Sequence, residues 1–180
     1  MYRAAGASTD VARHLAFAPG HGDPVMSAIR YVEKPPLANE VLNRLFAATA
    51  PDGEAPECTA GEEVKRRDCQ LVLRHSLVYL GAFHGKPLVG FVNVAWDGGV
   101  HGFLLDPTVH PTFRRRGIGL ELVRRATVVA AVRGLEWLHV DYEENLAPFY
   151  DKAGFASTRG GLNRLNAPRG SGSAVDAPAG

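Results

Sequence analysis

The sequence predicts an α/β domain built on a mixed sheet, and three observations point to this fold class. Three apolar stretches with strand-like patterns follow one another between residues 78 and 109, separated by short glycine-containing turns. Amphipathic patterns typical of helices lie on either side of this group. Strand and helix patterns then alternate toward the C-terminus, which is the element order of a layered α/β domain.

The first predicted elements are a strand over residues 28–33 and a helix after Pro35 and Pro36, which are tolerated at a helix start but not inside one. One face of this helix should pack on the core, because apolar residues recur at spacings of three to four: Leu37, Val41, Leu45 and Ala48. The residues PDG at 51–53 should end it. Residues 69–75 should form a second short helix, although their pattern fits a strand nearly as well.

The clearest β signal is the sequence VYLGAFH, LVGFVNVAW and VHGFLLDPTV, which predicts a three-stranded meander with turns at HGKP and DGG. The middle strand is apolar on both faces, so we expect it to lie centrally, with helices on each side. Pro107 removes a backbone donor from the third strand and therefore predicts a bulge or a point of splay.

After the meander, the sequence predicts a helix from about residue 118 to Gly134, with its apolar stripe beginning at Ile118. A strand over residues 136–142, a helix over 145–155 and a last strand over 157–165 should follow. We expect the folded domain to span residues 27–165. Residues 1–26 and 166–180 are rich in small residues, glycine and proline and are expected to be a disordered lead-in and tail.

Composition limits the classes of function. A chain of 180 residues with a net charge of +1 suits one globular domain and gives no overall attraction to nucleic acid or anionic lipid. The sequence has neither an apolar run long enough for a membrane helix nor a secretory start, so we expect a cytoplasmic protein. The two cysteines and the scattered His101, His110 and His139 lack metal-ligand spacing, and no metal is expected.

The sharpest local feature is the run RRRGIG at residues 114–119, between a strand and an amphipathic helix. The first amides of a helix lack internal partners and lie at the positive end of the helix dipole, so they bind phosphate oxygens. Gly117 and Gly119 allow close approach, and three arginines add charged donors. Neither GxxxxGK nor GxGxxG is present, and a solvated arginine run before an ordinary helix is the alternative.

Arg114, Gly117 and Gly119 match the coenzyme motif of the GNAT superfamily, which has Arg or Gln, two residues, Gly, one residue, and Gly or Ala. The preceding Val109 and His110 resemble the end of the family's central strand, and residues 145–155 are similar to its second motif. The resemblance covers residues 28–165. It implies a mostly antiparallel sheet with a splayed parallel strand pair, and acetyl-coenzyme A as the cofactor.

The resemblance also implies roles for individual residues. The coenzyme should be bound by the strand end, the arginine–glycine loop and the second motif: Val109, His110, Arg114, Arg115, Arg116, Gly117, Ile118, Gly119, Asn145 and Tyr150. The Val109 amide would stabilise the developing oxyanion of the thioester. Tyr150 is the candidate acid, since a phenol is protonated at neutral pH; the alternative is a packing aromatic.

An amine acceptor must lose a proton before it attacks, and Asp106 and Asp141 are the candidate bases, with water as a further option. The expected function is acetyl transfer to a primary amine of a small molecule or peptide, through a ternary complex. Alternatives are transfer of longer acyl chains, a catalytically silent coenzyme-binding domain, and an RNA-binding module that uses the arginines. A homodimer is left open.

Overall fold

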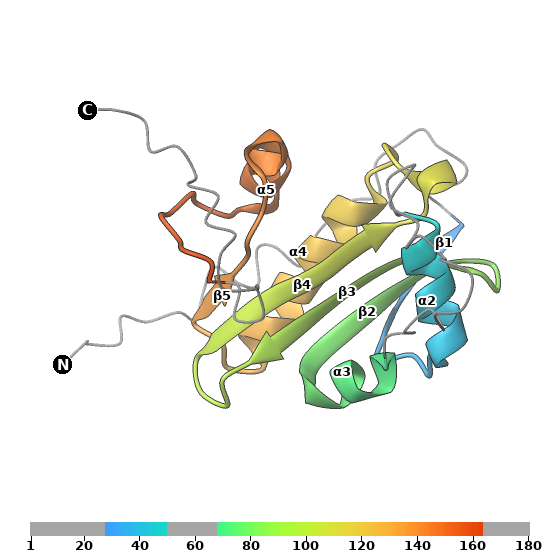
Figure 1. The fold of residues 1–180 in the computed structure, drawn as a ribbon, viewed down its shortest axis with the longest axis horizontal. Coiled ribbons are helices and arrows are strands. Elements are labelled where there is room, and N and C mark those ends of the chain that lie inside the picture. The colour runs from blue at the N-terminus through green and yellow to red at the C-terminus, as the bar shows by residue number, and fades with distance from the viewer. Residues whose placement is uncertain (1–27, 50–67, 164–180) are drawn as a thin grey trace, which may run out of the picture.

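The computed structural model describes residues 28–49 and 68–163, and the lead-in, the tail and the 51–53 turn predicted above lie outside these ranges. Its centre is a five-stranded sheet in the order β1-β2-β3-β4-β5 (Figure 1). The first four strands pair antiparallel, and β5 pairs parallel with β4. The strands are β1 (Ile29–Glu33), β2 (Ser76–His84), β3 (Leu88–Trp96), β4 (His101–Val109) and β5 (Trp137–His139).

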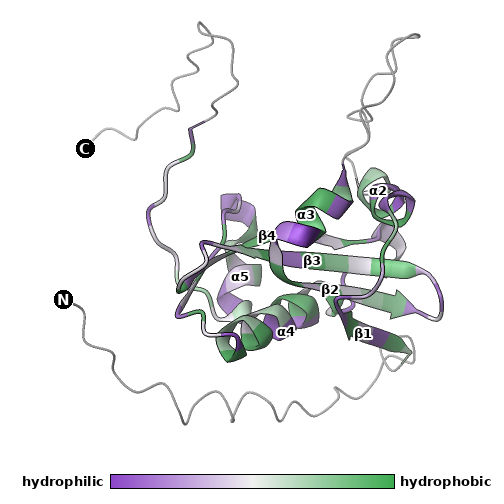
Figure 2. Ribbon diagram, turned by 90° about the horizontal axis from the view of Figure 1, so that it is seen from below, coloured by the Kyte–Doolittle hydropathy of each residue, from purple (hydrophilic) through white to green (hydrophobic). Residues whose placement is uncertain are grey.

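Helices cover both faces of the sheet, as predicted. The helices α2 (Asn39–Ala47) and α3 (Cys69–His75) lie on one face, and α4 (Ile118–Val132) lies on the other (Figure 2). Short 3-10 turns η2 (Pro111–Phe113) and η3 (Glu144–Leu146) precede α4 and α5 (Ala147–Ala153) respectively. The fold is therefore the expected three-layer α/β arrangement.

The central strand β3 connects two hydrophobic clusters, one on each face. Val92 and Val94 pack with the buried stripe of α4. Phe91 points the other way and packs with residues of α2 and α3. Burial of β3 on both faces confirms the prediction that this apolar strand is central.

One face of α2 differs from the prediction. Val41 is 36% exposed, whereas Leu42 is only 1% exposed and packs in the core with Leu37 and Leu45. The helix begins at Asn39, and Gln70 of α3 fixes the preceding chain by donating from Nε2 to the Leu37 carbonyl at 2.6 Å. This contact with α3 turns Leu42, rather than Val41, toward the sheet.

The strand β4 carries the predicted irregularity. Asn93 of β3 lies opposite Leu105, and Phe91 lies opposite Thr108, so β4 has one extra residue between these pairs. The bulge contains Asp106 and Pro107, and Asp106 has a φ of +53°. Parallel pairing of β4 with β5 ends at Phe103 and His139, which leaves the last part of β4 without a strand on that side among the described residues.

Two predictions for the C-terminal part are wrong. The strand expected over residues 136–142 is only three residues long, because the chain leaves β4 after His139. The last strand is not formed over the described residues 157–163. Gly160 and Gly161 have no neighbour within 4 Å of a built Cβ, and Leu162 is 85% exposed, so this segment buries no face that could hold it on the sheet.

Candidate active site

A cavity of about 390 Å³ opens where β4 and β5 diverge, between the end of β4 and α5. Its walls come from Thr49 just after α2, from β3, β4, Arg114, α4 and the η3–α5 segment, and most of them are apolar. The lining residues are Thr49, Phe91, Pro107, Thr108, Val109, Arg114, Gly119, Leu122, Leu146, Phe149 and Tyr150. The cavity therefore adjoins the last part of β4, which pairs with no strand on its β5 side among the described residues.

The end of β4 presents main-chain groups to this cavity. The His110 amide donates to the Val89 carbonyl of β3 at 2.9 Å. Successive amides of an extended strand point to opposite edges, so the Val109 amide faces away from β3, toward the cavity. The Val109 carbonyl accepts a hydrogen bond from Arg114 Nε at 3.2 Å, which holds that arginine against the same edge.

The loop between β4 and α4 is shaped by two left-handed residues. Arg115 has a φ of +62° and Gly117, the N-cap of α4, has a φ of +81°. The first hydrogen bond of the helix runs from the Glu121 amide to the Gly117 carbonyl at 3.0 Å. The amides of residues 118–120 precede this bond and form the positive end of a 15-residue helix, which suits an anion.

Gly119 keeps the helix start close to the cavity wall. A Cβ on this residue would lie 3.4 Å from Val109 Cγ2 and 3.7 Å from the Phe149 ring. An alanine would just make van der Waals contact, and a larger side chain would extend into the cavity. The glycine therefore leaves a passage between the helix start and α5, as a bulky phosphate-bearing ligand requires.

Tyr150 of α5 is the titratable residue that lines the cavity most deeply. It is 3% exposed, its ring stacks on Tyr142 with centroids 4.5 Å apart, and Phe149 and Phe155 meet it edge-on. Burial, followed by the neighbouring Tyr142, raises the pKa of Tyr150 above its ordinary value. The phenol is therefore protonated at neutral pH and can donate a proton.

The two candidate bases occupy different surroundings. Asp106, in the β4 bulge, accepts a hydrogen bond from Asn93 Nδ2 at 2.8 Å. It lies next to Pro107 and Thr108, which line the cavity. Asp141 is exposed on the chain after β5 and does not line the cavity. Neither aspartate lines the cavity itself, but Asp106 adjoins two residues that do.

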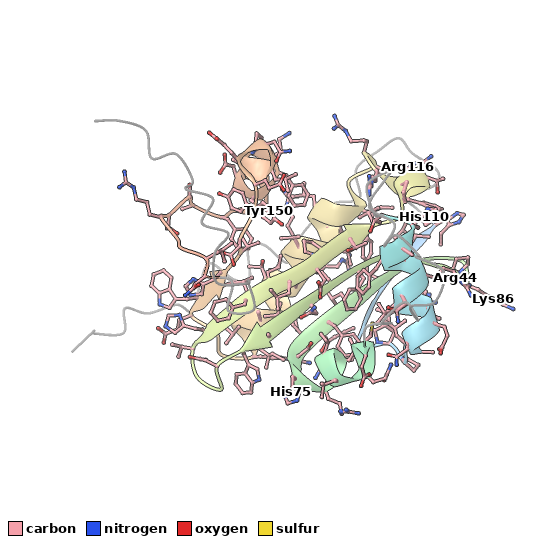
Figure 3. All side chains as sticks on the ribbon, viewed as in Figure 1. Arg44, His75, Lys86, His110, Arg116 and Tyr150 are labelled. Atoms are coloured by element: carbon pink, nitrogen blue, oxygen red, sulfur yellow. The ribbon has the colours of Figure 1, made fainter. Side chains whose placement is uncertain are left out.

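Four of the residues expected at the site line the cavity together, namely Val109, Arg114, Gly119 and Tyr150. Other residues expected at the site do not line the cavity. The Ile118 side chain is buried in the core, and only its backbone amide belongs to the start of α4. Asn145 is exposed and precedes the lining residue Leu146. His110 and Arg116 lie beyond the end of β4, and Tyr150 lies on the side of α5 (Figure 3).

Sequence reasoning missed the lining residues Phe91 and Phe149, and it also missed Asn93, which does not line the cavity but contacts Asp106. The two phenylalanines follow the same apolar spacing as core residues, so no signal separated them from the core. Asn93 is a polar residue within the apolar run of β3, and that break in the pattern was the signal available.

His101 and His139 lie on separate strands, as predicted, and their side chains meet across β4 and β5. His101 Nδ1 and His139 Nε2 are 2.9 Å apart.

Within residues 28–49 and 68–163, no helix combines the length and apolar character needed to cross a bilayer.

A family model described as the acetyltransferase (GNAT) family matches residues 42–155. The mycothiol acetyltransferase of Mycobacterium marinum is 35% identical over 100 residues, which is 56% of this chain. The aligned segment spans only 30% of that relative's length, so the match covers less than a third of the relative.

Solved structures share the fold at low identity. An aminoglycoside acetyltransferase from an uncultured soil metagenomic sample, in complex with sisomicin, has a TM-score of 0.57 and 14% identity, covering 81% of this chain and 99% of its own. A glucosamine-6-phosphate N-acetyltransferase from Arabidopsis thaliana has a TM-score of 0.57 and 13% identity, covering 77% and 99%. At these identities the likeness concerns the fold alone.

Proposed function

Because the chain belongs to the acetyltransferase (GNAT) family, we propose that it binds acetyl-coenzyme A between β4 and α5 and acetylates a primary amine. The observation that carries this proposal is the combination of a bare β4 edge, a helix N-terminus behind left-handed Gly117, and Gly119 between them. The β4 edge offers main-chain hydrogen-bonding groups to a ligand, and the helix N-terminus offers an anion site; both face one cavity.

The residues present fit the coenzyme. The amides of residues 118–120 would hold its pyrophosphate, with Arg114 adding a charged donor at the cavity wall. The unpaired edge of β4 near Val109 would take the amide groups of the pantetheine arm, and Gly119 leaves room for it to pass. When bound, the coenzyme supplies an acetyl group activated as a thioester.

Three groups of this chain would then do the chemistry. The Val109 amide, directed into the cavity, can stabilise negative charge on an oxygen that accepts its hydrogen bond. The Tyr150 hydroxyl, whose pKa burial raises further above the ordinary 10.0, holds a proton at neutral pH and can deliver that proton within the cavity. Asp106, fixed by Asn93, can attract an ammonium group and accept its proton directly or through water.

The acceptor is proposed at the level of a class. Two structural neighbours are named for aminoglycoside and glucosamine-6-phosphate acetylation, and the sequence relatives are named mycothiol acetyltransferases. These names support an amine-bearing small molecule as the acceptor of this chain. A peptide amine is the alternative acceptor, which the assay below also includes.

Calorimetry with acetyl-coenzyme A and coenzyme A tests the binding step. We expect saturable binding that weakens by about tenfold or more when Arg114 is changed to alanine, equivalent to roughly 1.4 kcal/mol. The matched control is Arg159→Ala, which changes an exposed arginine outside the cavity. Absence of binding to the unaltered protein would refute the proposal.

A thiol-release assay tests the transfer step. Acetyl-coenzyme A would be offered with an aminoglycoside, an amino sugar phosphate, a polyamine and a lysine peptide, and longer acyl-coenzyme A thioesters would be compared. Amine-dependent release supports acetyl transfer. Binding without release for any amine or thioester would favour a silent coenzyme-binding domain instead.

A further inference from the structure

Asn93 is a polar residue in the most buried strand of the protein. It lies in the middle of β3, between Val92 and Val94, and its exposure is 0%. Moving an amide side chain from water into such surroundings costs free energy unless its hydrogen bonds are replaced. An apolar residue would serve the core of this strand better, so the amide calls for another explanation.

The hydrogen bonds of Asn93 show which group it serves. Its Nδ2 donates to Asp106 Oδ2 at 2.8 Å, across the β3–β4 pair. Its Oδ1 lies 3.5 Å from Ser76 Oγ, but that hydroxyl has a better acceptor in the Val72 carbonyl at 2.9 Å. The strong contact of the Asn93 side chain is therefore the one with Asp106.

Asp106 occupies an unusual backbone position that needs such support. Its φ of +53° is rare for a residue with a side chain. Asp106 lies in the β4 bulge, directly before Pro107. In a bulge of this kind the backbone alone sets the side-chain direction poorly. A fixed donor on the neighbouring strand restricts the carboxylate to one orientation.

The orientation matters because of what surrounds Asp106. Its side chain borders a small cavity of about 10 Å³ on the α2–α3 face, whose other lining residues are apolar or a thiol: Leu42, Phe46, Cys69, Val72, Leu73 and Phe91. Phe91 also lines the larger cavity. The carboxylate thus lies where the α2–α3 face meets the site proposed for acetyl transfer.

We propose that Asn93 is a positioning residue that holds the Asp106 carboxylate toward the incoming amine. This inference rests on the proposed function, and it adds a residue whose side chain touches neither coenzyme nor acceptor. It acts through the Asn93 Nδ2–Asp106 Oδ2 hydrogen bond. The amide is retained in the core, against its cost in stability, because the carboxylate needs it.

The test compares Asn93→Leu, Asp106→Asn and the double variant. Leucine has a similar size and no polar atom, but it removes the donor to the Asp106 carboxylate, so the melting temperature of Asn93→Leu should stay the same or fall. We expect kcat with the best amine of the panel to fall by about tenfold or more, with the affinity for coenzyme A unchanged. In the Asp106→Asn background, Asn93→Leu should cause little further loss.

A purely structural role gives the opposite pattern. The loss of kcat caused by Asn93→Leu would be equally large with or without the Asp106 carboxylate. This result would overturn the proposal. Asn163→Leu, the same change at an exposed position, controls for nonspecific effects of the added leucine.

A spectroscopic readout does not depend on turnover. In the unaltered protein, the Asn93 side-chain amide should give a distinct, slowly exchanging pair of nuclear magnetic resonance signals that shifts in Asp106→Asn. Unchanged signals would show that the amide does not hold the carboxylate and would refute the inference. Lack of coenzyme binding would defeat the proposed function separately, while this measurement still decides whether the pair exists in solution.

Discussion

Replacing Gly119 with valine tests whether the cavity beside α4 is the coenzyme site. The Cβ of any residue at this position lies 3.4 Å from Val109 Cγ2 and 3.7 Å from the Phe149 ring, so it already completes the van der Waals contact. The two γ-carbons of valine reach about one bond length further and can only occupy space inside the cavity. They would stand between the β4 edge and α5.

The magnitudes separate binding from folding. Glycine is about 1 kcal/mol worse than alanine in a helix, and valine is also better than glycine, so Gly119→Val should not lower the free energy of unfolding through helix propensity. A blocked passage should weaken coenzyme A binding by about a hundredfold, or roughly 2.7 kcal/mol. Calorimetry gives the dissociation constant, and urea unfolding gives the stability.

Two controls accompany this variant. Gly119→Ala adds only the Cβ, so it should bind coenzyme A within a few-fold of the unaltered protein and be slightly more stable. Gly160→Val makes the same change as the test variant where nothing lies within 4 Å. A valine variant that is folded and binds coenzyme A normally would show that the ligand does not pass Gly119, and the reasoning would fail.

Three further perturbations have expected outcomes. Tyr150→Phe should lower kcat in the thiol-release assay by about a hundredfold while leaving coenzyme A affinity within twofold, because only the proton donor is lost; unchanged kcat would make Tyr150 a packing residue. Burial, with Glu121 adding and Arg125 opposing, raises the pKa of Tyr31 to about 12. Because the pKa of Tyr31 in the folded protein exceeds the ordinary 10.0, the free energy of unfolding is unaffected by this group below pH 10. It falls by roughly 2 kcal/mol as the pH rises from 10 toward 12, where only the unfolded chain loses the proton. Denaturant unfolding of Tyr31→Phe should show a shallower decline over that range, and an identical decline would refute the assignment. Gly102→Ala should destabilise the protein by about 1–3 kcal/mol, because its Cβ would overlap Leu135 Cδ1 and lie 3.1 Å from Val94 Cγ1, and Gly161→Ala, with open space around it, should not.

The turns and the bulge could be predicted from the sequence because single residues determine them. Gly98 adopts a φ of +84°, and Asp97 Oδ1 accepts the Gly99 amide at 2.7 Å, as a DGG turn requires. Gly134 ends α4 in the left-handed conformation. Pro107 marked the bulge because it lacks an amide hydrogen. Each of these signals acts within a few residues of the chain.

The length of β5 could not be predicted, because it depends on β4, more than thirty residues earlier in the chain. Residues 136–142 have strand character throughout, yet pairing stops after His139. The expected strand over 157–165, which two glycines interrupt, failed for a related reason: its described part buries no face against the protein. The local sequence pattern indicates that a segment can form a strand, but whether it does so depends on the strands available to pair with it.

The candidate site also contains residues that local motifs could predict and residues that depend on the three-dimensional structure. Three residues that the motifs singled out, Arg114, Gly119 and Tyr150, line one cavity, and they could be singled out because helix starts and glycine loops are local features. Asn93 escaped because its role depends on the residue that lies across the strand pair, and register is not visible in the sequence. The position of Asp106 next to cavity-lining residues likewise depends on the bulge, which only the three-dimensional structure shows.

The irregular end of β4 has a consequence beyond ligand binding. A strand edge with unpaired main-chain groups is the part of a sheet protein that most readily joins another chain and starts aggregation. Here the exposed stretch of edge is short, twisted by a bulge, and lacks one donor at Pro107. Such features are the ones by which natural sheets resist edge-to-edge association. The deviation that opens the cleft therefore also protects the protein's solubility.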